Sequence, residues 1–187
     1  RNFKKLRKNN YLNNFDIVCE RLAISNKSNK QTFYDQLNPN QTTSSLSPVG
    51  IINRRDYSGD IIKYSVNTIT LSDYIERKSV LKIDLLKIDI ESYEPQAIEG
   101  LGRYLLKFKP IIILEILNEK VATELNKVID TNEFQLFHLK KELKAERLEE
   151  FIVFDESIIN WEWNYIIFHN NLEDKIREQT TLFDNLI

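Results

Sequence analysis

Three carboxylates stand at or near the ends of apolar stretches in the middle of this chain, and that placement suits acid–base chemistry or the binding of a cation. Asp89 and Glu91 flank the end of the stretch 81–90, and Glu115 lies within the stretch 111–117. A carboxylate at the end of a buried strand is costly to desolvate, so it is solvated, paired with a cation or employed in the function. Asp89, Glu91 and Glu115 are therefore candidate catalytic residues.

Other polar residues in the same part of the chain leave alternatives open. Glu94 precedes a helix whose dipole favours an anion, so we expect it to be solvated or to complement that charge. His138 and His169 each follow an apolar stretch, and either could be a general base or a packed side chain. The carboxylates and a histidine could also bind magnesium, calcium or manganese, but their spacing is not diagnostic and we expect no metal.

The middle of the chain must position these carboxylates. Residues 81–90 and 111–117 have the composition of buried strands, and Pro95 stands where a first helical turn tolerates it. Strand, helix and strand in this order predict a parallel unit with a right-handed crossover, and such sheets bind ligands outside the carboxyl ends of their strands. Gly100 and Gly102 lie in the connecting helix, where we expect them to permit close packing on the sheet.

The rest of the chain supplies further helices and strands. We expect helices over 1–14, 71–78 (N-capped by Thr70 or Ser72), 121–129 and 172–186, strands over 16–24, 61–70, 134–139, 151–154 and 164–168, and an irregular segment over 31–60. The fold class is therefore α/β, with helices on both faces of a mostly parallel sheet.

Composition restricts the class of protein further. With 187 residues, 42% of them hydrophobic, the chain fits one main domain. Its 26 basic and 28 acidic residues leave a charge of -2, so we expect no nucleic-acid partner and no anionic membrane surface. Cys19 is alone, which excludes a disulfide framework, and no apolar run approaches the roughly 20 residues of a membrane span. We expect a cytoplasmic protein, and the lack of methionine indicates a fragment.

Three segments around the carboxylates form a linked pattern. They are Leu-Leu-Lys-Ile-Asp-Ile-Glu-Ser-Tyr-Glu over 85–94, Ala-Ile-Glu-Gly over 97–100 and Lys-Pro-Ile-Ile-Ile-Leu-Glu-Ile over 109–116. This pattern resembles the FkbM family of methyltransferases, and segments 22–25, 43–46 and 66–74 resemble it more weakly. Ser92 departs from the family, which usually has glycine there, and this questions the backbone conformation after Glu91.

The resemblance implies a Rossmann-like class I methyltransferase fold without its first strands. It implies a methyltransferase domain over 1–170, with a variable hairpin or loop at about 31–65, and a C-terminal helix over 171–187. S-adenosylmethionine would be the cofactor, with its glycine-rich turn and ribose-binding acid lying before Arg1. The residues implied to bind the cofactor are Leu22, Ala23 and Asp89; those that we assign to the substrate are Ser44, Ser45 and His138.

We therefore expect an S-adenosylmethionine-dependent O-methyltransferase in which Asp89 or Glu91 orients or deprotonates an acceptor hydroxyl. The acceptor would be a small molecule, a sugar or a lipid-linked compound, glycan biosynthesis is the expected setting, and the chain could form a homo-oligomer. The alternatives are a non-catalytic, methyltransferase-like binding or scaffold domain, a metal-assisted methyltransferase, and a nucleotide-sugar or dinucleotide enzyme with the same sheet.

Overall fold

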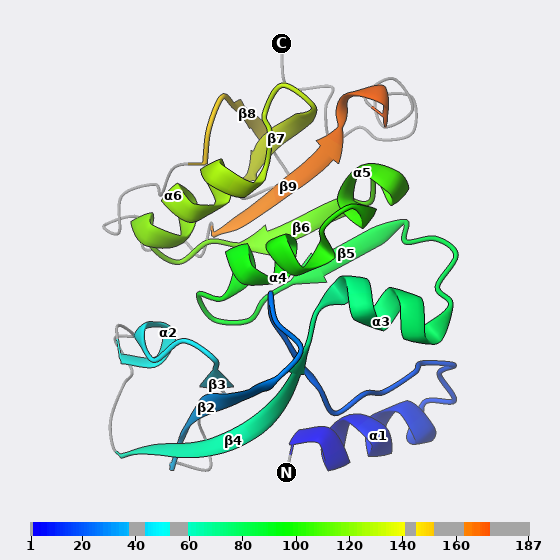
Figure 1. The fold of residues 1–187 in the computed structure, drawn as a ribbon, viewed down its shortest axis with the longest axis vertical. Helices are drawn as coiled ribbons and strands as arrows, with labels where there is room; N and C mark the ends of the chain where they lie inside the picture. The colour runs from blue at the N-terminus through cyan, green and yellow to red at the C-terminus, as the bar shows by residue number, and fades with distance from the viewer. Residues whose placement is uncertain (1, 38–43, 53–59, 141–144, 152–162, 173–187) are drawn as a thin grey trace.

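A computed structural model describes residues 2–37, 44–52, 60–140, 145–151 and 163–172 (Figure 1). The expected strand over 151–154 and the expected C-terminal helix therefore lie almost wholly outside the described residues. In chain order the elements are α1 (Asn2–Leu12), β1 (Ala23–Ile24), β2 (Lys30–Gln36), β3 (Ser44–Ser45), α2 (Val49–Ile52), β4 (Ile61–Ile69), α3 (Leu71–Lys78), β5 (Leu85–Ile88), α4 (Glu94–Leu101), α5 (Tyr104–Phe108), β6 (Ile111–Glu115), α6 (Glu119–Val128), β7 (Phe134–Leu139), β8 (Ala145–Leu148), β9 (Asn164–His169) and a short 3-10 helix (Asn170–Leu172).

Most expected elements are present, and their ends have physical causes. Helix α3 begins after Thr70, whose hydroxyl accepts from the amide of Asp73 at 3.0 Å, so Thr70 rather than Ser72 is the N-cap. The expected strand over 16–24 is reduced to Ala23–Ile24, and β2 lies in the segment expected to be irregular. Strand β8 was not expected, because its sequence is partly charged and lacks the apolar alternation that indicates a strand. It is a partly buried edge strand that pairs with β7.

The larger sheet has the strand order β5-β6-β9-β7-β8. Strands β5 and β6 are parallel, whereas β9 is antiparallel to both of its neighbours, β6 and β7. Strands β5, β6 and β7 thus run in one direction, because helices connect them as crossovers. Strand β9 lies between β6 and β7 and runs in the opposite direction.

The expectation of a mostly parallel sheet was wrong. In the larger sheet only β5 and β6 pair in parallel, and in the smaller sheet, of order β1-β4-β2-β3, only β1 and β4 do. The long β2–β4 pairing is antiparallel, from Lys30 opposite Asn67 to Gln36 opposite Ile61. A mixed α/β fold is confirmed, but antiparallel pairs dominate both sheets of the described chain, because several strands lack a helical crossover.

One face of the larger sheet carries α4 and α6, which lie in front of it in Figure 1. The main core forms there, where Ile98 and Leu101 of α4 and Leu125 of α6 are fully or almost fully buried with Ile112 and Leu114 of β6. A second, smaller cluster contains Phe137, Phe168 and Ala145. Strand alternation places Phe137 and Phe168 on the opposite face of the sheet.

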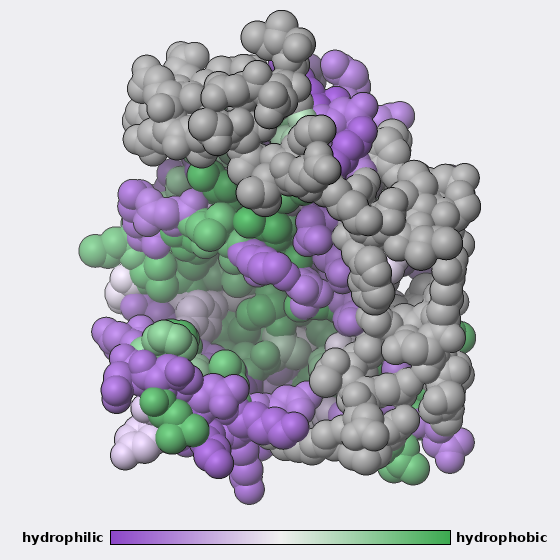
Figure 2. Space-filling view, turned by 180° about the vertical axis from the view of Figure 1, so that it is seen from behind, coloured by the Kyte–Doolittle hydropathy of each residue, from purple (hydrophilic) through white to green (hydrophobic). Residues whose placement is uncertain are grey.

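That opposite face shows no helix among the described residues, so the expectation of helices on both faces is met on one face only. Viewed from behind, hydrophobic residues gather in a hollow between the two sheets (Figure 2). On β5, alternation directs Leu85 to this face, and its side chain is 58% exposed. Among the described helices, none is long and apolar enough to span a bilayer.

Gly100 allows α4 to approach the end of β1, which confirms the close packing expected of it. A Cβ at this position would lie 2.3 Å from the carbonyl oxygen of Ser25. Gly102 has another reason, because it ends α4 with a φ of 53° that L side chains rarely adopt.

We expect Gly100→Ala to lower the free energy of unfolding by about 3 kcal/mol, because the methyl group would meet backbone atoms that cannot yield without moving α4 from β1. Urea denaturation of both proteins measures the change. Glu99→Ala, at the exposed neighbouring position, is the control and should cost less than about 1 kcal/mol. Equal stability of Gly100→Ala and the native chain would contradict this packing.

Candidate active site

The register of β5 and β6 brings Asp89 and Glu115 together. Ile88 is opposite Leu114, so the next residues, Asp89 and Glu115, emerge side by side where the two parallel strands end. Alternation directs both away from the face that α4 and α6 cover, because Leu114 points into the main core and Glu115 is its neighbour. Their carboxyls are close enough to form a hydrogen bond when one is protonated.

This pair stands in a strongly negative environment. Burial, first of all, raises the pKa of Glu115 to about 7, and the charges of Asp89, Glu91 and Glu94 and the hydrogen bond to Asp89 also raise it. The Nζ atom of Lys87 lies 2.7 Å from an Asp89 carboxylate oxygen. One lysine thus pairs with Asp89. Because the pKa of Glu115 is about 7, both its ionised and its protonated forms are populated at neutral pH.

The loop after β5 has an unusual backbone that presents Glu91. Glu91 and Ser92 both have left-handed φ values, 57° and 69°. The hydroxyl of Ser45, which is buried in β3, lies 3.1 Å from the carbonyl oxygen of Ile90 and 2.7 Å from that of Glu91, to which it donates. The smaller sheet therefore holds this loop from one side.

Glu94, at the start of α4, restrains the same loop through a hydrogen bond. It is fully buried, so the expectation that it is solvated was wrong, whereas its place in the first turn of α4 agrees with the other expectation, that it complements the helix charge. Its Oε1 atom accepts from the amide of Ile90 at 3.0 Å. Burial raises its pKa to about 7, although the amides of Glu94, Ile90 and Ser92 act in the opposite direction. Among the described residues, its Oε2 atom has no hydrogen-bond partner.

A further contact joins the smaller sheet to the loop. The hydroxyl of Tyr93 donates to Oε1 of Gln31 on β2 at 3.1 Å, and the amide of Gln31 donates to the Ser25 hydroxyl at 2.8 Å. Both ends of the Gln31 side chain are thereby used. Sequence reasoning missed Gln31 and the supporting role of Glu94, because nothing in their spacing shows which loop they reach.

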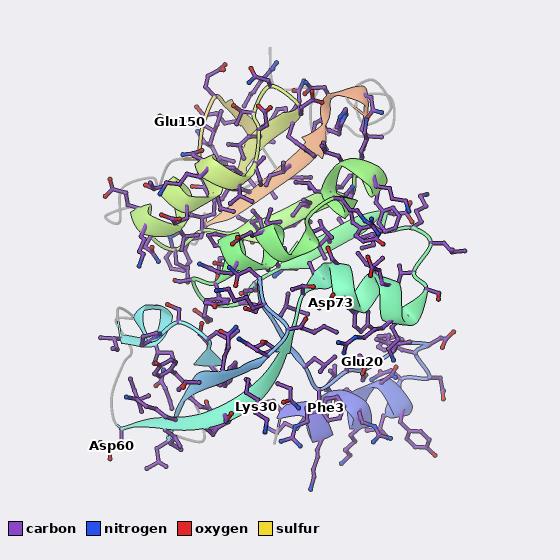
Figure 3. All side chains as sticks on the ribbon, in the orientation of Figure 1. Phe3, Glu20, Lys30, Asp60, Asp73 and Glu150 are labelled. Atoms are coloured by element: carbon purple, nitrogen blue, oxygen red, sulfur yellow. The ribbon has the colours of Figure 1, made fainter. Side chains whose placement is uncertain are left out.

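The sequence-derived cofactor and substrate residues lie in several places. Ser45 contacts the carboxylate loop, and Ser44 is its neighbour in β3. Leu22 is 41% exposed and lines a shallow hollow of about 380 Å³ on the smaller sheet, together with Lys30 and Arg77. Ala23 begins β1 and is opposite Thr68 of β4. Figure 3 shows Lys30 on β2, below the ends of β5 and β6. The hollow and the carboxylate loop are therefore distinct features.

The structure does not bring the histidines to the carboxylates. His138 is opposite Tyr165, which is opposite Leu114, so His138 points to the face covered by helices. It is 1% exposed, and its ring centroid is 5.0 Å from that of Tyr165. His169 lies at the opposite end of β9 from Glu115's partner Asn164 and is paired with Phe134. Its Nε2 atom lies 3.2 Å from a Glu133 carboxylate oxygen.

In the described part of the chain, no three His, Cys, Asp or Glu side chains are placed so that they could hold a metal ion. Asp89 and Glu115 instead form a pair that shares a hydrogen bond when one of them is protonated, and the buried Glu94 supports the loop that follows Asp89. Such a pair can accept a proton from a substrate or contact a cationic group.

The fold and site define the class as a mixed α/β protein with a pair of carboxyl groups at the carboxyl ends of two parallel strands. The sequence matches the family described as "Methyltransferase FkbM domain" over residues 1–149. The chain therefore belongs to the FkbM methyltransferase family. Searches of curated proteins and of solved structures gave no match.

Proposed function

We propose that this chain is an S-adenosylmethionine-dependent O-methyltransferase, with a hydroxyl of a small molecule or glycan as the acceptor. The observation that carries the proposal is the Asp89–Glu115 pair, in which the pKa of Glu115 is raised to about 7. A general base is most effective when its pKa is close to the working pH. Membership of the family supports methyl transfer as the reaction.

The chemistry of the carboxylates fits the cofactor. S-adenosylmethionine supplies a methyl group on a positively charged sulfur, which is open to attack by a nucleophile. Asp89, Glu91 and Glu115 carry more negative charge than Lys87 neutralises, so their site favours a cationic ligand such as the sulfonium or ammonium group of the methionine end. We assign Asp89 to that end, and Glu91 and Glu115 to the acceptor side.

The acceptor hydroxyl must lose its proton as its oxygen takes the methyl group that the bound cofactor would supply from its sulfur. That proton goes to Glu115, which can take it at neutral pH because it is partly ionised there. Asp89 accepts a hydrogen bond from the protonated Glu115 and holds its carboxyl in place. The sequence suggested Asp89 or Glu91 for the proton transfer, and the raised pKa of Glu115 favours Glu115 instead.

Calorimetric titration of the full-length protein with S-adenosylhomocysteine, with and without magnesium, tests the proposal. We expect micromolar binding in both conditions. We also expect Asp89→Asn to weaken it about tenfold or more, because a charged contact to the methionine end is lost. The matched control, Asp84→Asn, changes an exposed aspartate that pairs with Lys82, and should bind as the native chain does. An absence of binding in both conditions would favour the non-catalytic scaffold.

A further inference from the structure

Ser92 occupies a backbone conformation that favours glycine. Its φ is 69°, and Glu91 before it has a φ of 57°. Left-handed geometry costs a non-glycine residue about 1 kcal/mol or more, so two such residues in succession persist only where the surroundings hold them. The question is therefore what the serine hydroxyl contributes that a glycine would not.

The hydroxyl joins two loops. Nδ2 of Asn118 donates to Oγ of Ser92 at 2.8 Å. The other end of the same amide, Oδ1, accepts from the backbone amide of Val121 at 3.1 Å and caps α6. Asn118 follows Glu115 by three residues, so this bond spans from the loop after β5 to the loop after β6.

We propose that Ser92 is a positioning residue, whose hydroxyl, through Asn118, fixes the spacing between the loop that carries Asp89 and Glu91 and the strand end that carries Glu115. The inference rests on the proposed function for its catalytic meaning. The geometry itself stands apart from it, because the link is made by side chains outside the proposed proton transfer.

Side chains at four positions restrain the loop. Ser45 from β3 bonds the carbonyls of Ile90 and Glu91, and Glu94 from α4 bonds the amide of Ile90. Gln31 from β2 bonds the hydroxyl of Tyr93, and Asn118 bonds the side chain of Ser92. Of these, only the Asn118 bond connects the loop to the segment that follows Glu115. Removal of the Ser92 hydroxyl should therefore affect the distance between the strand ends more than the fold of the loop.

The charged groups that face Glu115 determine in which direction its pKa should change when the link is lost. Asp89 and Glu91 come from the loop and Glu94 from α4, Lys87 pairs with Asp89, and the residue opposite Glu115 on β9 is the uncharged Asn164. If the loop moves away, Glu115 gains solvent and loses repulsion from its neighbours. Both changes lower its pKa.

The test is Ser92→Gly, which removes the hydroxyl and suits the left-handed backbone, so the variant should fold. Carbon-13 NMR titration of the glutamate side-chain carboxyls follows Glu115 directly, with Glu115→Gln assigning its signal. We expect Ser92→Gly to lower the pKa of Glu115 by about half a unit or more. The matched control is Ser79→Gly, because Ser79 also has a left-handed φ, 52°, but lies at the end of α3.

A second variant acts on the other partner. Asn118→Ser retains a residue that caps α6 well but lacks the amide donor, so it should lower the pKa of Glu115 as Ser92→Gly does. The double variant should shift the pKa no further than either single one, because all three remove one link. An unchanged titration in both single variants, or full additivity in the double, would overturn the proposal.

The outcome also separates this inference from the proposed function. The NMR titration needs no cofactor and no acceptor, so it reports on the positioning even in a chain that transfers no methyl group. A lowered pKa without cofactor binding would support the link and reject methyl transfer. Cofactor binding with an unchanged titration would do the reverse.

Discussion

Glu115→Gln is expected to lower kcat for methyl transfer by about 10² to 10⁴, the contribution typical of general acid–base catalysis. The amide has nearly the same shape as the carboxyl, but it cannot take the acceptor proton. In the native chain, activity should also fall as pH drops below about 7, because burial and the neighbouring carboxylates raise the pKa of Glu115 to that value and its protonated form cannot act as a base. Transfer of a labelled methyl group, followed across pH, measures both effects.

Glu119→Gln is the control for this change. Glu119 is exposed in the first turn of α6, four residues beyond Glu115, and undergoes the same loss of charge. It should leave kcat within about twofold, because an exposed charge contributes little. If Glu115→Gln retained native kcat and an unchanged pH profile, Glu115 would not be the base, and the role would return to Asp89 or Glu91.

Glu94→Gln is expected to change how stability depends on pH. Burial raises the pKa of Glu94 from 4.5 to about 7 in the folded chain, so folding favours the protonated form. This contribution is complete below about pH 4.5 and is lost as pH rises through 7, and it amounts to about 3 kcal/mol. The variant is neutral throughout and does not lose it. Relative to the native chain, Glu94→Gln should therefore gain about 3 kcal/mol in unfolding free energy between pH 4 and pH 8.

Urea denaturation at several pH values measures this difference. Glu99→Gln, an exposed position on the same helix, is the control and should follow the native chain across the range. The contribution of Glu115 has the same sign and changes little between the chains, because the charge of Glu94 is the smallest of the causes that raise the pKa of Glu115. Parallel stability curves for Glu94→Gln and the native chain would show that Glu94 is not the titrating group.

The sequence alone located the strands and helices that carry the site. Local signals suffice for that, because Thr70 caps a helix, Pro95 begins one, and apolar stretches define β5, β6, β7 and β9. It also indicated the family to which the chain belongs, and it predicted Asp89, Glu91 and Glu115 as candidate catalytic residues. Each of these conclusions depends on residues close together in the chain.

Only the tertiary structure decided which residues meet. The register of β5 against β6 makes Asp89 and Glu115 neighbours. The reversed direction of β9 places His169 at the opposite end of the strands from these carboxylates. Register, and the direction of pairs without a helical crossover, depend on contacts between residues distant in sequence, and the periodicity of one segment does not show which strand lies beside it. For the same reason, the support that Glu94 and Ser45 give to the loop was visible only in the folded chain.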